Sequence, residues 1–418
     1  MRKSVLFLIA VALLIISACN RGPKVKYVLE MSTPDVVCAM ANNTNDTLFN
    51  QAINEAKEQW KTNPNSDFLS LFEESMARLD PEVRLAPYFE ARLSDRIKNN
   101  YENASVINVL RSEIDEGIDY TCQVLETRIN TFGVSARNIH IQRQGKSDRI
   151  ILEVSGVKDT ARMRNLLQTT AELQFWLVAK VKDAFHYLED VNKFIATTNA
   201  SIEKTPDSSM DELLVNSTDS SYIQQTEYNK NNPLFAKLYP NINPQTGEFE
   251  DACVLAYASP DDIADINEMF YKACQKYIIP SKIKFLWSAK PSIYNDMFEL
   301  YAVQVSNRDG SPLLDGSVIN DARQTFNNFS GNEIFMTMNS EGSREWQRIT
   351  ANNVGEFVAI VIDNKVFVAP RVMGEITGGR SSISGDFTTE EAKDLANLIK
   401  SGKLPIPVKI VEETIMEP

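Results

Sequence analysis

The chain has 418 residues, with 43 Lys and Arg against 56 Asp and Glu, a net charge of −13 and a hydrophobic share of 43%. This length predicts two or three domains, and the hydrophobic share is enough to build their cores. The acidic balance argues against a nucleic-acid-binding protein, which would present a basic face. His140 and His186 are the only histidines, so histidine metal sites and most histidine-dependent acid–base catalysis are nearly excluded. We therefore expect a protein that is not an enzyme.

The N-terminus has the pattern of a targeting segment. Arg2 and Lys3 precede an apolar run of twelve residues, from Val5 to Ile16. A bilayer-spanning helix needs about 20 such residues, so the run fits a signal peptide better. Residues 1–18 are therefore predicted to be a signal peptide. Cys19 follows Ser17 and Ala18, which resembles the lipobox of bacterial lipoproteins, and we expect Cys19 to carry the lipid.

The alternative is an uncleaved helical anchor that ends in a cysteine. Either interpretation places the rest of the chain on the periplasmic side of the cell envelope, attached to a membrane. Removal of residues 1–18 takes away two basic residues and no acidic ones, so the exported part carries a charge of −15.

Hydrophobic periodicity predicts the elements of the first half in chain order. A strand at 27–31 is followed by helices at 48–60 and 68–79, the second with Ser66 as its N-cap. A long helix at 107–129, strands at 139–144 and 149–154, a helix capped by Thr160 and a strand at 173–177 come next. With the helical stretch 38–103 counted as an insertion, this order is β-α-β-β-α-β, the ferredoxin-like arrangement.

The second half begins with a stretch at 196–233 that is rich in polar residues and is typical of a surface loop. Strands are predicted at 300–305, 333–338, 357–362, 365–369, 371–376 and 408–412, and helices at 322–326 and 343–353. Thr388 and Glu391 form a capping box that opens a further helix ending at Lys400. The pair Gly378-Gly379 indicates a hairpin turn, because no phosphate-binding glycine pattern surrounds it.

No catalytic, cofactor-binding or metal-binding residues are predicted. The two histidines form no triad with Ser and Asp, and the Asp-Gly pairs at 309–310 and 315–316 lack the acidic spacing of a calcium loop. Four cysteines remain besides Cys19, and an oxidising compartment permits them to pair. Cys122 lies on an apolar helical stripe and is expected to be a buried thiol. Cys253 and Cys274 are candidates for a disulfide, although spacing alone does not assign one.

Several longer motifs resemble one known family. They are Arg128-Ile129-Asn130, LEVSGVKD at 152–159, AIVIDNKVFVAP at 359–370, and ISGDFTTEEAKDLANLIKSGKLPIPVKIVEE at 383–413. Together they look like the first periplasmic (P1) domain of SecD, a membrane subunit that assists Sec-dependent protein export. The long insertions resemble those of fused SecDF proteins of the Bacteroidetes type. The resemblance extends from about residue 27 to the end of the chain.

The resemblance implies an α+β fold in which a head subdomain is inserted into a ferredoxin-like base. The base would comprise 19–37, 104–180 and 404–418, the helical insertion 38–103, and the head 181–403 with the polar loop 196–233. The head would hold unfolded or translocating polypeptide, with the membrane subunits of the Sec translocon as further partners. Its swinging, coupled to proton flow in the membrane part, would prevent backsliding. The implied hinge residues are Lys180, Asp183, Gly402 and Pro405, and neither a cofactor nor nucleic acid is implied.

The chain also departs from the family pattern. The family's Asp- and Gly-rich motif after its first transmembrane helix is replaced here by Asn20-Arg21-Gly22-Pro23-Lys24, and the sequence stops at Pro418, where the family enters its second transmembrane helix. We therefore expect either a stand-alone lipoprotein relative or a fragment of a longer protein. The functional hypotheses are an anchored periplasmic module that binds polypeptide during export, and a structural or scaffold lipoprotein that keeps the fold without translocation activity.

Overall fold

The computed structural model describes residues 23–416, apart from 64–65, 133, 135–137, 144–147, 203–226, 244, 247, 250, 293–294, 308–309, 330 and 386. The chain divides into two compact units. Unit 1 comprises the chain up to Ala171 and again from Ser401, and unit 2 comprises Glu172–Lys400. Unit 2 is thus inserted into the sequence of unit 1. Within the described ranges, no helix combines the length and the apolar character needed to cross a membrane.

Unit 1 contains a four-stranded sheet built from both ends of the chain. Its strands are β1 (Lys24–Met31), β2 (Ile139–Arg143), β3 (Arg149–Ser155) and β15 (Val408–Met416), in the order β15-β1-β3-β2 with all neighbours antiparallel. Tyr27 lies opposite Leu152, and both are buried, whereas the next pair, Lys26 and Glu153, points to the other face. Because side chains alternate along a strand, the sheet has one apolar face to be covered.

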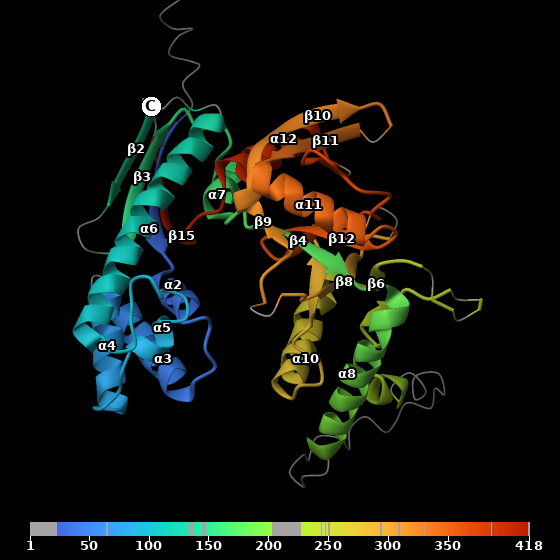
Figure 1. Cartoon of the computed structure of the whole chain (residues 1–418), viewed down its shortest axis with the longest axis horizontal. Coiled ribbons are helices and arrows are strands. Elements are labelled where there is room, and N and C mark those ends of the chain that lie inside the picture. Colours follow the sequence, from blue (N-terminus) through green and yellow to red (C-terminus); the bar gives the residue numbers. More distant parts are fainter. Residues whose placement is uncertain are drawn as a thin grey trace, which may run out of the picture. The chain divides into compact units, whose positions relative to one another are not determined.

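Two helices join the strands of this sheet. They are α6 (Asn103–Thr131) and α7 (Thr160–Gln168), and Figure 1 shows α6 running along the sheet. The buried residues of α6 recur every three or four positions, as in Leu110, Ile114 and Ile118, which gives the helix one apolar stripe. The element order of unit 1 is therefore β1-α6-β2-β3-α7-β15. The helix predicted at 107–129 is confirmed.

The fourth strand of unit 1 is not the one predicted. The sequence count assigned it to 173–177, but β4 (Leu173–Val178) belongs to unit 2, and β15 takes the place beside β1. Phe175 and Trp176 are both almost fully buried although they point to opposite faces. Such a strand requires a packed layer on each side. Eight of the nine residues of β15 are exposed or half-exposed, and three of them are charged, which suits the edge of a sheet.

The stretch between β1 and α6 is helical, as predicted. It contains α2 (Thr33–Met40), α3 (Thr47–Thr62), α4 (Phe68–Leu79) and the short α5 (Ala86–Phe89). Phe49 is at the centre of their packing, with the rings of Phe72 and Tyr88 at centroid distances of 5.4 and 5.2 Å. The N-cap of α4 is Asp67 rather than the predicted Ser66, because the Asp67 carboxylate accepts a hydrogen bond from the Ser70 backbone N–H.

Unit 2 is built on an eight-stranded sheet. Its strands are β4, β5 (Leu238–Pro240), β6 (Val254–Ala258), β7 (Ile283–Ser288), β8 (Phe298–Gln304), β9 (Leu314–Asp315), β12 (Phe357–Ile362) and β13 (Lys365–Val368), in the order β5-β6-β8-β7-β13-β12-β4-β9. An additional pairing of β8 with β4 closes β4, β12, β13, β7 and β8 into a ring. Trp176, Val303 and Val361 belong to the apolar cluster that the ring encloses.

Two further layers cover the outer faces of this ring. A three-stranded sheet of β10 (Ile319–Asn327), β11 (Gly331–Met338) and β14 (Arg380–Ser384) lies with α11 (Ser340–Asn352) and α12 (Thr389–Ser401) around one core, which includes Phe175 and Ile360. A second core joins α8 (Val181–Ile202) and α10 (Ile263–Gln275) to β5, β6 and β8. Figure 1 shows these helices beside their strands. Short 3-10 turns occupy Pro260–Asp262 and Gly316–Val318.

Unit 2 confirms some predicted elements and corrects others. The capping box is confirmed, because Thr388 N–H donates to Glu391 Oε2 at 2.9 Å and Glu391 N–H to Thr388 Oγ1 at 3.2 Å. The helix predicted at 322–326 is wrong, since these residues pair with β11 as part of β10. The strand predicted at 371–376 is reduced to a single bridge at Arg371. The polar stretch 196–233 begins as helix, because α8, which was not predicted, continues to Ile202.

Candidate functional site

The candidate site is an apolar groove of about 620 Å³ in unit 2. Trp346 of α11 and Val358 and Ile360 of β12 contribute apolar lining from the core side. The segment 370–376 and residues 380–382 of β14 supply the rest of the lining. A groove of this size and composition is large enough for several side chains of a bound molecule.

The Trp346 side chain is held in a fixed position. It is 5% exposed, its Nε1–H donates to Ser381 Oγ at 2.9 Å, and its ring lies 5.1 Å from the Phe175 ring. A buried tryptophan with its N–H satisfied has little freedom to rotate. This part of the groove is therefore preorganised.

The segment 370–376 is attached to the end of β12 by backbone hydrogen bonds. Val358 N–H donates to Pro370 O at 3.1 Å, and Val372 N–H donates to Glu356 O at 2.8 Å. Beyond these bonds, Met373 is 86% exposed at the groove. A flexible thioether in such a position adapts to differently shaped apolar partners.

β14 supplies an outer strand next to the groove. In the described part of the chain it pairs with β11 on one side, at the end of the sheet order β10-β11-β14. Gly379 precedes it with φ +58°, and a Cβ there would lie 2.0 Å from Ser343 Oγ, so only glycine fits this turn. An edge strand exposes N–H and C=O groups to which an extended peptide can add.

Two basic side chains beside the groove are paired with carboxylates. The Arg371 guanidinium donates to Asp251 Oδ2 at 2.8 Å, lies 4.6 Å from the Phe357 ring centroid and lowers the pKa of the Asp251 carboxyl. Lys180 Nζ lies 3.0 Å from Glu356 Oε1 and 3.6 Å from Asp251 Oδ1. The groove lining itself also includes the charged residues Glu375 and Arg380.

The first passage of the chain between the units lies earlier in the sequence than the predicted hinge residues Lys180 and Asp183. The chain passes between the units at Ala171/Glu172 and at Lys400/Ser401. Lys180 and Asp183 thus lie within unit 2, where Asp183 is in the first turn of α8. The shift follows from the pairing of β4 with β12, which fixes that strand in unit 2. Gly402 and Pro405 lie in unit 1, shortly after the second passage.

Sequence reasoning missed the residue that binds both connections, Arg128. Its side chain is 1% exposed and belongs to α6. Its guanidinium donates hydrogen bonds to Leu166 O (3.3 Å), Thr169 O, Thr170 O (3.0 Å), Gly402 O (2.9 Å) and Ser401 Oγ (3.2 Å). One buried cation therefore holds the C-terminal end of α7 and the segment after α12 together within unit 1. The signal in the sequence was an arginine in the apolar stripe of a helix.

The remaining predicted groups are the N-terminal targeting segment and the four other cysteines. Residues 1–18 and Cys19 lie outside the described residues. Cys38, Cys122, Cys253 and Cys274 are free thiols, so the candidate Cys253–Cys274 disulfide is absent, and Cys122 is half-buried. The described ranges contain no group of three or more His, Cys, Asp or Glu side chains arranged to hold a metal ion.

Two family models match the chain. A model of the SecDF P1 head subdomain matches residues 297–406, and a model of the N-terminal part of the P1 domain of protein translocase subunit SecDF matches residues 118–180. Protein translocase subunit SecD of Rhodothermus marinus is 32% identical over 400 residues, which is 93% of this chain and 60% of that protein. SecDF of Thermus thermophilus is 39% identical over 103 residues, 25% of this chain and 14% of that protein.

Solved structures of SecDF are also similar. SecDF in its super-membrane-facing form is 22% identical over 72% of this chain and 28% of the solved chain, with a TM-score of 0.39. A second structure, of "a membrane component SecDF that enhances protein export", is 23% identical over 71% of this chain and 92% of the solved chain, with a TM-score of 0.37. By its sequence matches, the chain contains a SecD P1 domain, with residues 118–180 in its N-terminal part and residues 297–406 in its head.

Proposed function

We propose that this chain assists Sec-dependent protein export by holding unfolded or translocating polypeptide in the groove of unit 2, on the periplasmic side of the membrane. The SecD match over 93% of the chain supports a role in export. The observation that carries polypeptide binding is the groove itself, in which an apolar lining with Trp346 lies beside the outer strand β14. An extended segment would pair with that strand and place apolar side chains in the groove.

In the same proposal, unit 1 is a ferredoxin-like base and unit 2 is the head. The order β15-β1-β3-β2 with helices α6 and α7 between the strands supports the first assignment. We place the hinge at the two connections bound by Arg128, near 169–172 and 401–405. The chain spans 60% of the length of the Rhodothermus SecD. Participation in the complete translocase activity, together with membrane subunits of the Sec translocon, is therefore also part of what we propose.

Photocrosslinking tests the groove. A photoreactive phenylalanine analogue replaces Met373 at the groove or, as a matched control, Tyr277, which is 91% exposed in unit 2 and outside the groove lining. In cells holding an arrested secretory protein, we expect an adduct from position 373 and none from position 277. Equal adducts at both positions, or none at either, would contradict binding in the groove.

A binding measurement makes the same comparison without cells. The affinity of the purified chain for a fluorescent unfolded apolar peptide is measured by anisotropy. Met373→Asp places a charge in the apolar groove and is expected to weaken binding about tenfold, since burying that charge against an apolar chain is costly. Tyr277→Asp should leave the affinity unchanged. Equal affinities of both variants and the wild type would point to the scaffold hypothesis.

A further inference from the structure

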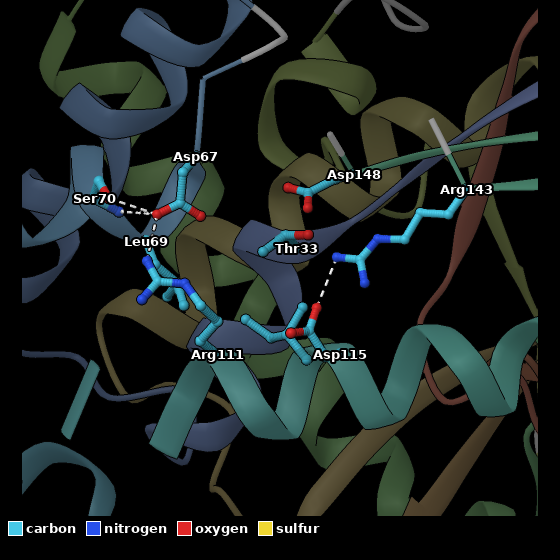
Figure 2. Close-up of a pocket in the computed structure, with 9 residues that line it drawn as sticks. Thr33, Asp67, Leu69, Ser70, Arg111, Asp115, Arg143 and Asp148 are labelled. Carbon is cyan, nitrogen blue, oxygen red and sulfur yellow. Dashed lines mark hydrogen bonds and ion pairs between the residues drawn. The ribbon is translucent and has the colours of Figure 1, made fainter. Parts of the chain in front are cut away.

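Unit 1 contains a second cavity, of about 480 Å³, in which charged side chains predominate. Figure 2 shows its lining. Thr33 comes from α2, Asp67, Leu69 and Ser70 from the start of α4, Arg111, Ile114 and Asp115 from α6, and Arg143 and Asp148 from the ends of β2 and β3. The helical insertion and the sheet of unit 1 thus both contribute to it.

Two ion pairs fix opposite walls of the cavity. Arg111 Nη2 lies 2.6 Å from Asp67 Oδ2, and that carboxylate also accepts hydrogen bonds from the Ser70 N–H and hydroxyl. Arg143 Nη2 lies 2.7 Å from Asp115 Oδ1. Figure 2 shows both pairs, with Asp148 and Thr33 lying between them. These four charges compensate one another in pairs.

Among the described residues, three polar atoms of the cavity lining have no hydrogen-bond partner of normal geometry, although the Thr33 hydroxyl lies near enough to the Asp148 carboxyl to lower its pKa. They are Asp148 Oδ2, Thr33 Oγ1 and Arg143 Nε, and all three are buried. The Thr33 side chain belongs to a residue that is 2% exposed. Buried polar atoms are almost always hydrogen-bonded in native proteins, so three in one cavity indicate a missing partner. That partner must present a donor to the Asp148 carboxylate and an acceptor to Arg143 Nε–H or the Thr33 hydroxyl.

We propose that this cavity binds a small organic cation of the ammonium or guanidinium class that carries a hydrogen-bond acceptor beside its charge. The cavity lining contains three Asp and two Arg side chains. Because Asp67 and Asp115 are each paired with an arginine, the excess negative charge is that of Asp148. A cation with N–H donors neutralises this charge and satisfies Asp148 Oδ2. An anion would meet three carboxylates. This site is separate from the groove of unit 2, and the proposal does not depend on polypeptide binding there.

The protonation of Asp148 agrees with this assignment. Burial raises the pKa of its carboxyl to about 6, and the nearby charges of Asp67 and Asp115 add to the rise while Thr33 and Arg143 oppose it. A bound cation favours the ionised carboxylate and must lower this pKa. By linkage, affinity for the cation is expected to fall as the pH drops below about 6.

The test titrates the whole chain with L-arginine amide, methylguanidinium and tetramethylammonium at constant ionic strength. Amide NMR shifts of residues 33, 67–70, 111–115 and 148 report binding in the wild-type protein. Arginine amide should bind most tightly, because it supplies both donors and an acceptor, and tetramethylammonium should not bind, because it has no N–H. A Gly-Arg-Gly peptide tests whether the natural ligand is a free small cation or an arginine side chain of a polypeptide. If the peptide binds as tightly as arginine amide, the cavity binds guanidinium groups and the natural ligand is a polypeptide side chain.

Asp148→Asn removes the charge and keeps the size of the side chain. It should weaken arginine amide binding tenfold to a hundredfold, the range expected for loss of a charged hydrogen bond. Asp190→Asn, at an exposed position of α8, is the matched control and should change nothing. The proposal would be overturned if the NMR shifts of the wild-type protein were equal for all three cations. It would also be overturned if no shifts appeared up to high millimolar concentration, because the cavity would then hold water only.

Discussion

Replacing Arg128 with lysine should loosen both connections between the units without unfolding unit 2. The guanidinium makes at least five hydrogen bonds, four of them to main-chain carbonyls. A lysine ammonium has three N–H groups, so at least two acceptors lose their donor. At about 1.5 kcal/mol for each charged hydrogen bond, the local cost is about 3 kcal/mol. This corresponds to roughly a hundredfold faster local opening.

Hydrogen exchange followed by mass spectrometry measures this effect segment by segment. In Arg128→Lys, protection should fall in residues 166–172 and 401–406 and stay constant in the core strands of unit 2. Arg164→Lys is the matched control. It makes the same substitution at an exposed residue of α7, which is paired with Glu413. Such surface pairs contribute at most about 1 kcal/mol. If the two variants exchange alike, or if only one connection loses protection, the shared role of Arg128 is refuted.

Three further predictions concern unit 2. Gly342→Ala should lower the melting temperature although alanine favours helices, because its Cβ would lie 2.5 Å from Val318 Cβ, and Val318→Gly, which removes that Cβ, should relieve the clash; a stabilised single variant would contradict the packing. A thiol reagent should label exposed Cys274 well before Cys253, whose pKa is raised to about 12 by burial, and equal rates would contradict that burial. Thr388→Ala should cost about 1 kcal/mol in a denaturation experiment through loss of the α12 cap, and an unchanged midpoint would argue against the capping box.

Local periodicity was sufficient to predict much of the fold. The stripe of α6 and the capping box at Thr388 depend on residues a few positions apart, and both are confirmed. The partner of a strand depends on residues hundreds of positions away. The sequence at 173–177 is a good strand in either sheet, and its pairing with β12 and its burial on both faces assign it to unit 2.

The sites were harder to predict for the same reason. Trp346 and Ser381 meet in the groove although the β12–β13 hairpin and a loop separate them in sequence. In unit 1 the lining of the charged cavity comes from five elements or their ends, and no two of Thr33, Asp67 and Asp148 are neighbours in the chain. Sequence motifs consist of residues that lie close together in the chain, so they do not reveal a site whose residues come from distant segments. Arg128 was visible as part of a motif, but four of its acceptors are backbone carbonyls, which leave no trace in the sequence.

The position of β15 at the very end of unit 1 has a consequence for the order of folding. β1 pairs with β15 along its whole length, from Lys24 opposite Met416 to Met31 opposite Val408. Until those last residues arrive, one edge of β1 lacks its neighbour and can template a wrong pairing. All strands of unit 2 lie within Glu172–Lys400, so that unit can complete its sheets first. Because contacts between positions so far apart in the sequence form slowly, we expect the pairing of β15 with β1 to be a late step in the folding of unit 1.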